Sequence, residues 1–164
     1  MRKLLVFLTL FVYLILTSIT SYAEESQDDL LQQQMIMQDK LITLRDITQC
    51  QVVYYNFSLY FAVANTIAKD FKINEKNREP LLKIYKNSKD KYNQFREISK
   101  ELMKESTEIG IPWNIIQQTE FIGQRMATDQ LSALSNSLFE DPTYGDVFFD
   151  SLIAISNQCD NLLK

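Results

Sequence analysis

The sequence contains no histidine, and its 164 residues include only three glycines, three prolines and two cysteines. Without histidine the chain cannot build Ser-His or Cys-His nucleophilic pairs, histidine acid–base catalysis or most of the usual zinc, copper and haem sites. Three glycines are too few for a glycine-rich phosphate-binding loop. We therefore expect a non-enzymatic protein with no catalytic residue, no cofactor and no metal site.

Residues 1–23 have the three-part pattern of a secretory signal peptide. Arg2 and Lys3 supply positive charge, residues 4–16 are almost wholly apolar, and small residues stand three and one positions before a cut after Ala23. A spanning helix needs roughly 20 apolar residues, and this run is shorter, although an uncleaved anchor is the alternative. We expect export to the periplasm or the extracellular space, with no membrane span after cleavage.

Cys50 and Cys159 are the only cysteines. In an exported protein an even number of cysteines indicates a disulfide, and two thiols allow a single pairing within the chain. Closing a loop of about a hundred residues stabilises a fold by roughly 4–5 kcal/mol. Two buried free thiols are the alternative. Because there is no C-x-x-C motif, the bond is expected to be structural rather than redox-active.

Apolar residues recur at steps of three and four from Met37 to Phe71, and neither glycine nor proline interrupts them. This spacing predicts one long amphipathic helix or two nearly in line. Further helices are predicted for residues 80–108, for residues 112–139 with a bend at Gly123, and after the turn at 140–146. The predicted core positions of the third helix are Trp113, Ile116, Ile122, Met126, Leu131, Leu134 and Leu138.

Short connections imply antiparallel neighbours, so the sequence predicts an all-α, up-down-up-down four-helix bundle closed by one disulfide. Both cysteines then fall on core-facing stripes at the same end of the bundle. The first helix is longer than the others, so its beginning either projects or forms an extra N-terminal helix. The predicted organisation is a signal peptide (1–23), a polar lead with an amphipathic helical segment (24–46), and the bundle domain (47–164).

Residues 28–46 have no obvious place inside this bundle. Their apolar stripe of Met37, Leu41 and Leu44 would pack against the rest of the chain, a second copy or a different protein. The aromatic residues Tyr54, Phe57 and Phe61 are either core or the lining of a pocket for an apolar ligand.

Three weak signals for chemistry have simpler explanations. Ser88–Lys91 fits the S-x-x-K pattern of penicillin-binding enzymes, but the companion motifs are missing. A helical face of carboxylates next to lysines is typical of a solvated surface, and a second acidic group lacks the spacing of a calcium loop. The two groups are Glu97, Glu101, Glu105 and Glu108, and Glu140, Asp141, Asp146 and Asp150.

The formal net charge is −4, and the basic residues between Lys69 and Lys104 alternate with acidic ones. We therefore expect no nucleic-acid binding. The expected function is that of an exported, non-enzymatic helical protein that binds another envelope protein as an accessory, inhibitor or adaptor. The alternatives are a carrier of an apolar ligand and a hydrolase that uses carboxylates alone.

Overall fold

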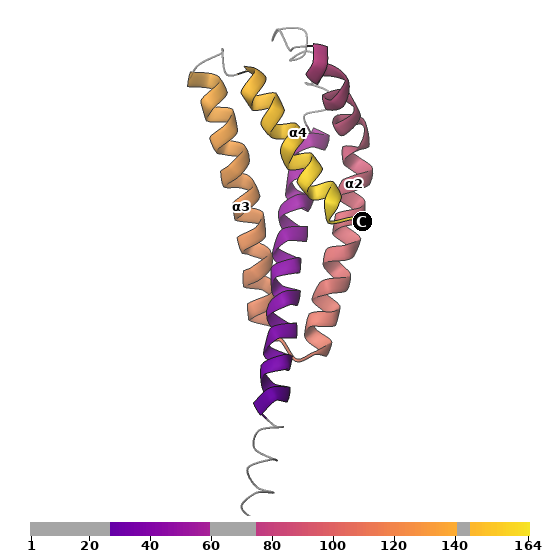
Figure 1. Ribbon diagram of the computed structural model, residues 1–164, viewed down its shortest axis with the longest axis vertical. Coiled ribbons are helices and arrows are strands. Elements are labelled where there is room, and N and C mark those ends of the chain that lie inside the picture. The colour runs from indigo at the N-terminus through magenta and orange to yellow at the C-terminus, as the bar shows by residue number, and fades with distance from the viewer. Residues whose placement is uncertain (1–26, 60–74, 141–144) are drawn as a thin grey trace, which may run out of the picture. The chain divides into compact units, whose positions relative to one another are not determined.

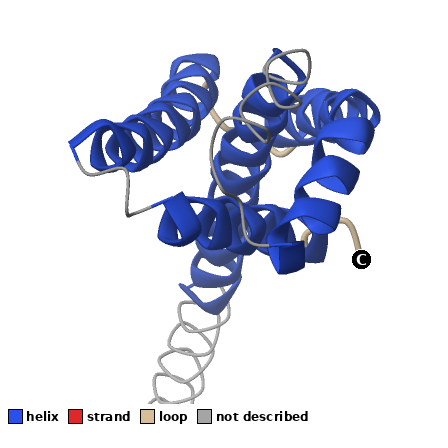
Figure 2. Ribbon diagram, turned by 90° about the horizontal axis from the view of Figure 1, so that it is seen from above, coloured by secondary structure: helices blue, strands red, loops and turns tan. Residues whose placement is uncertain are grey.

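The computed structural model describes residues 27–59, 75–140 and 145–164. Every regular element in these ranges is a helix (Figure 2). The chain divides into two compact units, Met1–Asp39 and Lys40–Lys164. The predicted signal peptide and Phe61 lie outside the described residues.

The first helix occupies residues 27–59, and it is followed by α2 (Glu75–Glu108), α3 (Trp113–Glu140) and α4 (Gly145–Asn161). Within Lys40–Lys164, successive helices run in opposite directions (Figure 1). The helix α2 packs against both α3 and α4, which also contact each other. The prediction of an all-α, up-down-up-down four-helix bundle is confirmed.

The predicted disulfide is also present. Cys50 and Cys159 are bonded and bury all but 6% and 2% of their surfaces, so the bond ties the first helix to α4 inside the core. Around it, the ring of Tyr54 stacks on Phe95 at 5.7 Å and meets Phe57 edge-on at 5.8 Å. The centre of the bundle is therefore an aromatic layer next to a covalent cross-link.

The start of α2 differs from its prediction. The helix begins at Glu75 rather than at Pro80, which lies inside it. Proline lacks the N–H that would bond the carbonyl four residues earlier, so the helix loses one bond near its N-terminal end and continues. The predicted end at Glu108 is correct.

The connection between α2 and α3 follows the predicted stop and restart at residues 110–112. Gly110 adopts a φ of +87°, and the N–H of Ile111 donates to the carbonyl of Ser106 at 3.0 Å. This is the glycine-terminated helix end known as the Schellman motif. The carbonyl of Pro112 then accepts from the N–H of Ile116, and α3 begins.

The core-facing side of α3 was partly mispredicted. Trp113, Ile122 and Met126 are 55%, 43% and 40% exposed, whereas Ala127 is fully buried and Gly123 lies against the first helix. The helix runs through Gly123 without interruption. The small residue Gly123 allows α3 to approach the first helix closely. A search for large apolar residues overlooks such small contact residues.

The beginning of the bundle also lies earlier than the predicted residue 47. Leu44 is fully buried, and the ammonium of Lys40 is paired with the Glu105 carboxylate of α2. Residues 40–46 are therefore part of the bundle unit rather than of a separate N-terminal segment. Among the described helices, none is both long and apolar enough to cross a membrane.

Candidate functional site

The predicted partner-binding stripe does not form one exposed face. Met37 and Leu41 are half-buried, and Leu44 is fully buried. Leu44 is therefore a core residue and is unavailable to a partner. The stripe was drawn from helical spacing alone, which does not distinguish a face that meets the bundle from one that meets solvent.

A different set of apolar side chains is exposed within residues 27–39. Leu30, Leu31, Met35 and Ile36 are 57%, 52%, 70% and 48% exposed. The same segment contains Asp28, Asp29 and Asp39 and no lysine or arginine. We call Leu30, Leu31, Met35 and Ile36 the N-terminal apolar surface.

The aromatic residues predicted to line an apolar pocket instead fill the core. Tyr54 and Phe57 are 1% and 3% exposed, and Phe57 also packs against Tyr85 with ring centroids 5.8 Å apart. These contacts leave no room for an apolar ligand between the two rings. The third predicted residue, Phe61, is outside the described residues.

A cavity of about 480 Å³ does lie beside Tyr54, between α2 and α4. Its α2 wall contains polar side chains at every fourth position, and its α4 wall contains a hydroxyl, a carboxamide and a carboxylate. We call it the α2–α4 cavity, and it is lined by Tyr54, Glu79, Pro80, Lys83, Ile84, Asn87, Lys91, Ile153, Ser156, Asn157 and Asp160.

The floor of the α2–α4 cavity is a closed hydrogen-bond network. The Tyr54 hydroxyl donates to Asp160 Oδ1 at 2.6 Å and lies 2.8 Å from Ser156 Oγ. The Lys91 ammonium lies 3.3 Å from the same Asp160 oxygen. Burial, together with the bond to the Asp160 carboxylate, raises the pKa of Tyr54 well above its usual value, so the phenol stays neutral. This network joins the first helix, α2 and α4.

The S-x-x-K pattern does not produce a nucleophile. Ser88 is 1% exposed, and its hydroxyl donates to the carbonyl of Tyr85 at 2.7 Å. Lys91, the other end of the pattern, is paired with Asp160. A substrate cannot reach the serine oxygen, so this pattern supports no chemistry.

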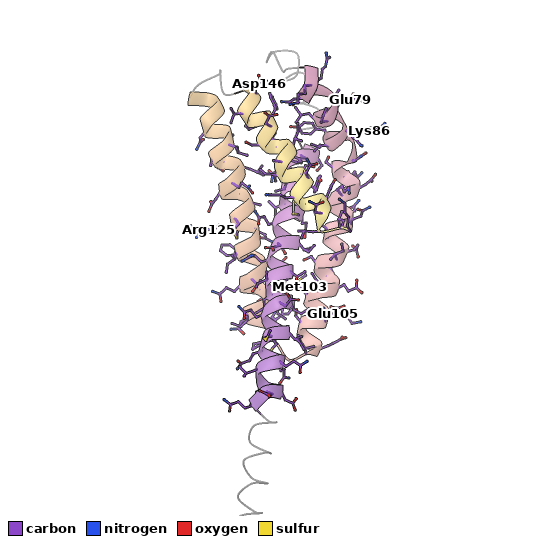
Figure 3. The ribbon with its side chains drawn as sticks, viewed as in Figure 1. Glu79, Lys86, Met103, Glu105, Arg125 and Asp146 are labelled. Atoms are coloured by element: carbon purple, nitrogen blue, oxygen red, sulfur yellow. A yellow bond between two sulfur atoms is a disulfide. The ribbon has the colours of Figure 1, made fainter. Side chains whose placement is uncertain are left out.

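Three of the four glutamates on the predicted carboxylate face, Glu97, Glu105 and Glu108, form ion pairs rather than an acid–base site. Glu97 lies 2.7 Å from the Lys100 ammonium, and this hydrogen bond lowers the pKa of the carboxyl. Glu105, which lies near the C-terminal end of α2 (Figure 3), pairs with Lys40. A glycosidase needs one carboxyl that is held protonated by a raised pKa. The shift at Glu97 has the opposite sign.

The acidic group near the start of α4 is only partly described. Asp150 accepts a 2.7 Å hydrogen bond from the side-chain amide of Asn77, and Asp146 is exposed at the helix start. The side chains of Glu140 and Asp141 lie outside the described residues. Where side chains are described, no three of the acidic and cysteine residues are grouped so that they could hold a metal ion.

No known family model, curated protein or solved structure matches the chain. Sequence reasoning missed the α2–α4 cavity, although its signal was present. Polar side chains recur every four residues on α2, at Glu79, Lys83, Asn87 and Lys91, and so share one line along the helix. The same spacing of polar residues is equally typical of a solvated helix face.

Proposed function

We propose that this chain is an exported, non-enzymatic protein that binds another protein of the cell envelope through the N-terminal apolar surface. The predicted signal peptide and the disulfide support export, since disulfides form and persist in oxidising compartments. The absence of histidine, the buried Ser88 and the ion-paired glutamates support a binding role rather than catalysis.

The observation that carries the proposal is the exposure of four large apolar side chains within residues 27–39. Leu30, Leu31 and Met35 are each more than half exposed, and Ile36 is 48% exposed. Fully burying a leucine, isoleucine or methionine side chain contributes about 1.5–3 kcal/mol. Leu31 and Met35 are four residues apart and so share one face of the helix, and a helix that lays side chains at this spacing into an apolar groove is a recurrent mode of peptide recognition.

The charge of the segment indicates what kind of partner fits it. Residues 27–39 contain Asp28, Asp29 and Asp39 and no basic residue. Two copies paired along this segment would bring only carboxylates together, and juxtaposed like charges oppose association. We therefore infer a different protein, whose groove has an apolar floor and a basic rim.

Photo-crosslinking tests this proposal directly. A photoreactive residue is placed at position 31 or 35, with position 100 as the control because Lys100 is exposed on α2. Cross-linking is carried out in the native envelope, and the product is identified by mass. Binding is then reconstituted with the purified partner.

We expect positions 31 and 35 to cross-link to one distinct protein that position 100 does not capture. When the purified partner is added to the purified chain, the complex should bury the side chains of Leu31 and Met35 from solvent. Cross-links that join only two copies of this chain would contradict the charge argument. The same yield from position 100 would contradict the assignment of the surface.

A further inference from the structure

The α2–α4 cavity has the size and construction of a small-molecule site. Its volume of about 480 Å³ falls within the roughly 300–1,000 Å³ typical of ligand pockets. All of its lining residues belong to the unit Lys40–Lys164. Nothing in the proposed protein-binding role uses it.

The polar side chains in the inner part of the α2–α4 cavity already have bonding partners, and this part is rigid. Tyr54, Ser156, Asp160 and Lys91 bond to one another. The neighbouring Cys159 is fixed to Cys50 by the disulfide. One carboxylate and one ammonium cancel in this network, so the floor carries no net charge to attract an ion. A ligand would meet a fixed, neutral floor.

The outer part of the α2–α4 cavity presents groups that still have bonding capacity. The side chains of Glu79, Lys83, Asn87 and Asn157 make no hydrogen bond or ion pair with any other described residue. Glu79 and Lys83 carry opposite charges one helical turn apart, and they are not within ion-pair distance of each other. The outer part therefore offers one carboxylate, one ammonium and two carboxamides.

These groups select a ligand that carries both charges. An anion such as phosphate would be attracted by Lys83 but repelled by Glu79. A cation would be attracted by Glu79 but repelled by Lys83. A sugar would leave both charges without a charged partner. It would also find no aromatic face, because the Tyr54 ring is buried. A zwitterion satisfies both charges at once.

The spacing of the two charged residues indicates the length of the zwitterion. Residues four apart on a helix are separated by about 6 Å along its axis. Two extended amino-acid residues span at most about 7 Å. In a single amino acid the ammonium and carboxylate share one carbon, so it could engage only one of the two charges well.

We propose that the α2–α4 cavity binds a dipeptide-sized zwitterion, with its ammonium on Glu79 and its carboxylate on Lys83. Asn87, one turn beyond Lys83, donates to the same carboxylate. The Asn157 carboxamide on the facing wall pairs with the peptide group, since a carboxamide both donates and accepts. The aliphatic side chains of Ile84 and Ile153 contact small apolar side chains of the ligand.

Titration of the purified, oxidised protein with dialanine, followed by NMR, tests this proposal. The comparison ligands are alanine, tetra-alanine, N-acetyl-dialanine, dialanine amide, glucose and phosphate. Dialanine should shift the amide signals of Asn87 and Asn157. The acetylated and amidated forms should bind about tenfold more weakly or worse, because each loses one charge-assisted contact.

Matched variants on α2 complete the test. Lys83→Met should weaken dialanine binding about tenfold or more, whereas Lys86→Met should change it less than about twofold. Lys86 lies on the same helix as Glu79 (Figure 3), and it is not among the residues that line the cavity. Because Lys83 is exposed, its replacement should not perturb folding.

Three results would overturn the proposal. The first is the absence of shifts at about 10 mM dialanine, a concentration tenfold above a Kd of 1 mM. The second is binding of the blocked peptides, glucose or phosphate as tightly as dialanine. The third is an equal loss from Lys83→Met and Lys86→Met. Equally tight binding of alanine or tetra-alanine would refute the assigned length.

Discussion

Gly123→Ala separates two physical effects that act in opposite directions. A Cβ at position 123 would clash with the carbonyl oxygen of Arg45 and lie 3.1 Å from the Cβ of Thr48. Both atoms belong to the first helix. The carbonyl oxygen is part of the backbone, so it cannot move aside as the end of a flexible side chain could.

The expected magnitude follows from these two effects. Replacing glycine by alanine inside a helix is worth about 1 kcal/mol in favour of alanine. Inserting a methyl group into a closely packed interface costs about 1–3 kcal/mol, and a contact with rigid backbone belongs near the upper end. We therefore expect Gly123→Ala to lower the free energy of unfolding by about 2 kcal/mol, the difference between these two effects.

Urea denaturation with the disulfide intact measures this change. Gln124→Gly and Gln124→Ala provide the matched control, because Gln124 is the exposed neighbour on α3 and the pair reports helix propensity alone. In that pair alanine should be more stable than glycine by about 1 kcal/mol. If Gly123→Ala stabilises the protein by a similar amount, the close approach of α3 to the first helix is wrong.

The remaining predictions concern bonds inside the bundle. Tyr54→Phe should destabilise the protein by about 1.5–3 kcal/mol in urea denaturation, because it removes a bond to a carboxylate; an unchanged midpoint would refute the Tyr54–Asp160 bond. The folded-state pKa of Tyr54 is raised above its usual 10.0, so unfolding free energy should fall as pH rises above that value. The added slope, up to about 1.4 kcal/mol per pH unit, should be absent in Tyr54→Phe. Reducing Cys50–Cys159, which spans a sequence separation of 109, should cost about 4–5 kcal/mol; a loss below about 1 kcal/mol would contradict its structural role. A double-mutant cycle of Lys40→Met and Glu105→Gln should give a coupling of about 1 kcal/mol or less, since the two side chains are 32% and 40% exposed and the pair is screened by solvent.

The features that could be predicted from sequence are those with a strong local signal. Periodicity identified the helices, and the glycine–proline punctuation at residues 110–112 located the α2–α3 turn. The disulfide followed from having two cysteines in a chain with an apparent export signal. The helix and turn signals depend only on residues that are close in the sequence, and two cysteines can form only one disulfide within a chain. None of these predictions requires knowledge of how the helices pack.

The features that were missed depend on which side of each helix meets another helix. Trp113 and Met126 have the spacing of core residues, yet α3 packs through Gly123 and Ala127. The sequence left open whether the stripe that includes Leu44 meets the rest of the chain or a partner, and Leu44 is fully buried within the bundle. Hydrophobic spacing identifies a stripe but not its neighbour, and close helix contacts favour small residues that leave a weak hydropathy signal.

The candidate sites were harder to predict for the same reason. Asn157 and Lys83 are distant in sequence and come together only when α4 lies along α2. The polar line on α2 was visible, but a cavity wall and a solvated face have the same sequence pattern.

The most direct test of the proposed function compares two double variants for affinity to the cross-linked partner. Leu31→Glu with Met35→Glu and Gln32→Glu with Gln34→Glu add the same charge to exposed positions of one helix. The first pair should weaken binding about thirtyfold, which corresponds to losing about 2 kcal/mol of apolar burial. The second pair should retain wild-type affinity or bind more tightly, and both should unfold at the wild-type urea midpoint. Equal affinity of the Leu31/Met35 variant and the wild type would contradict the account.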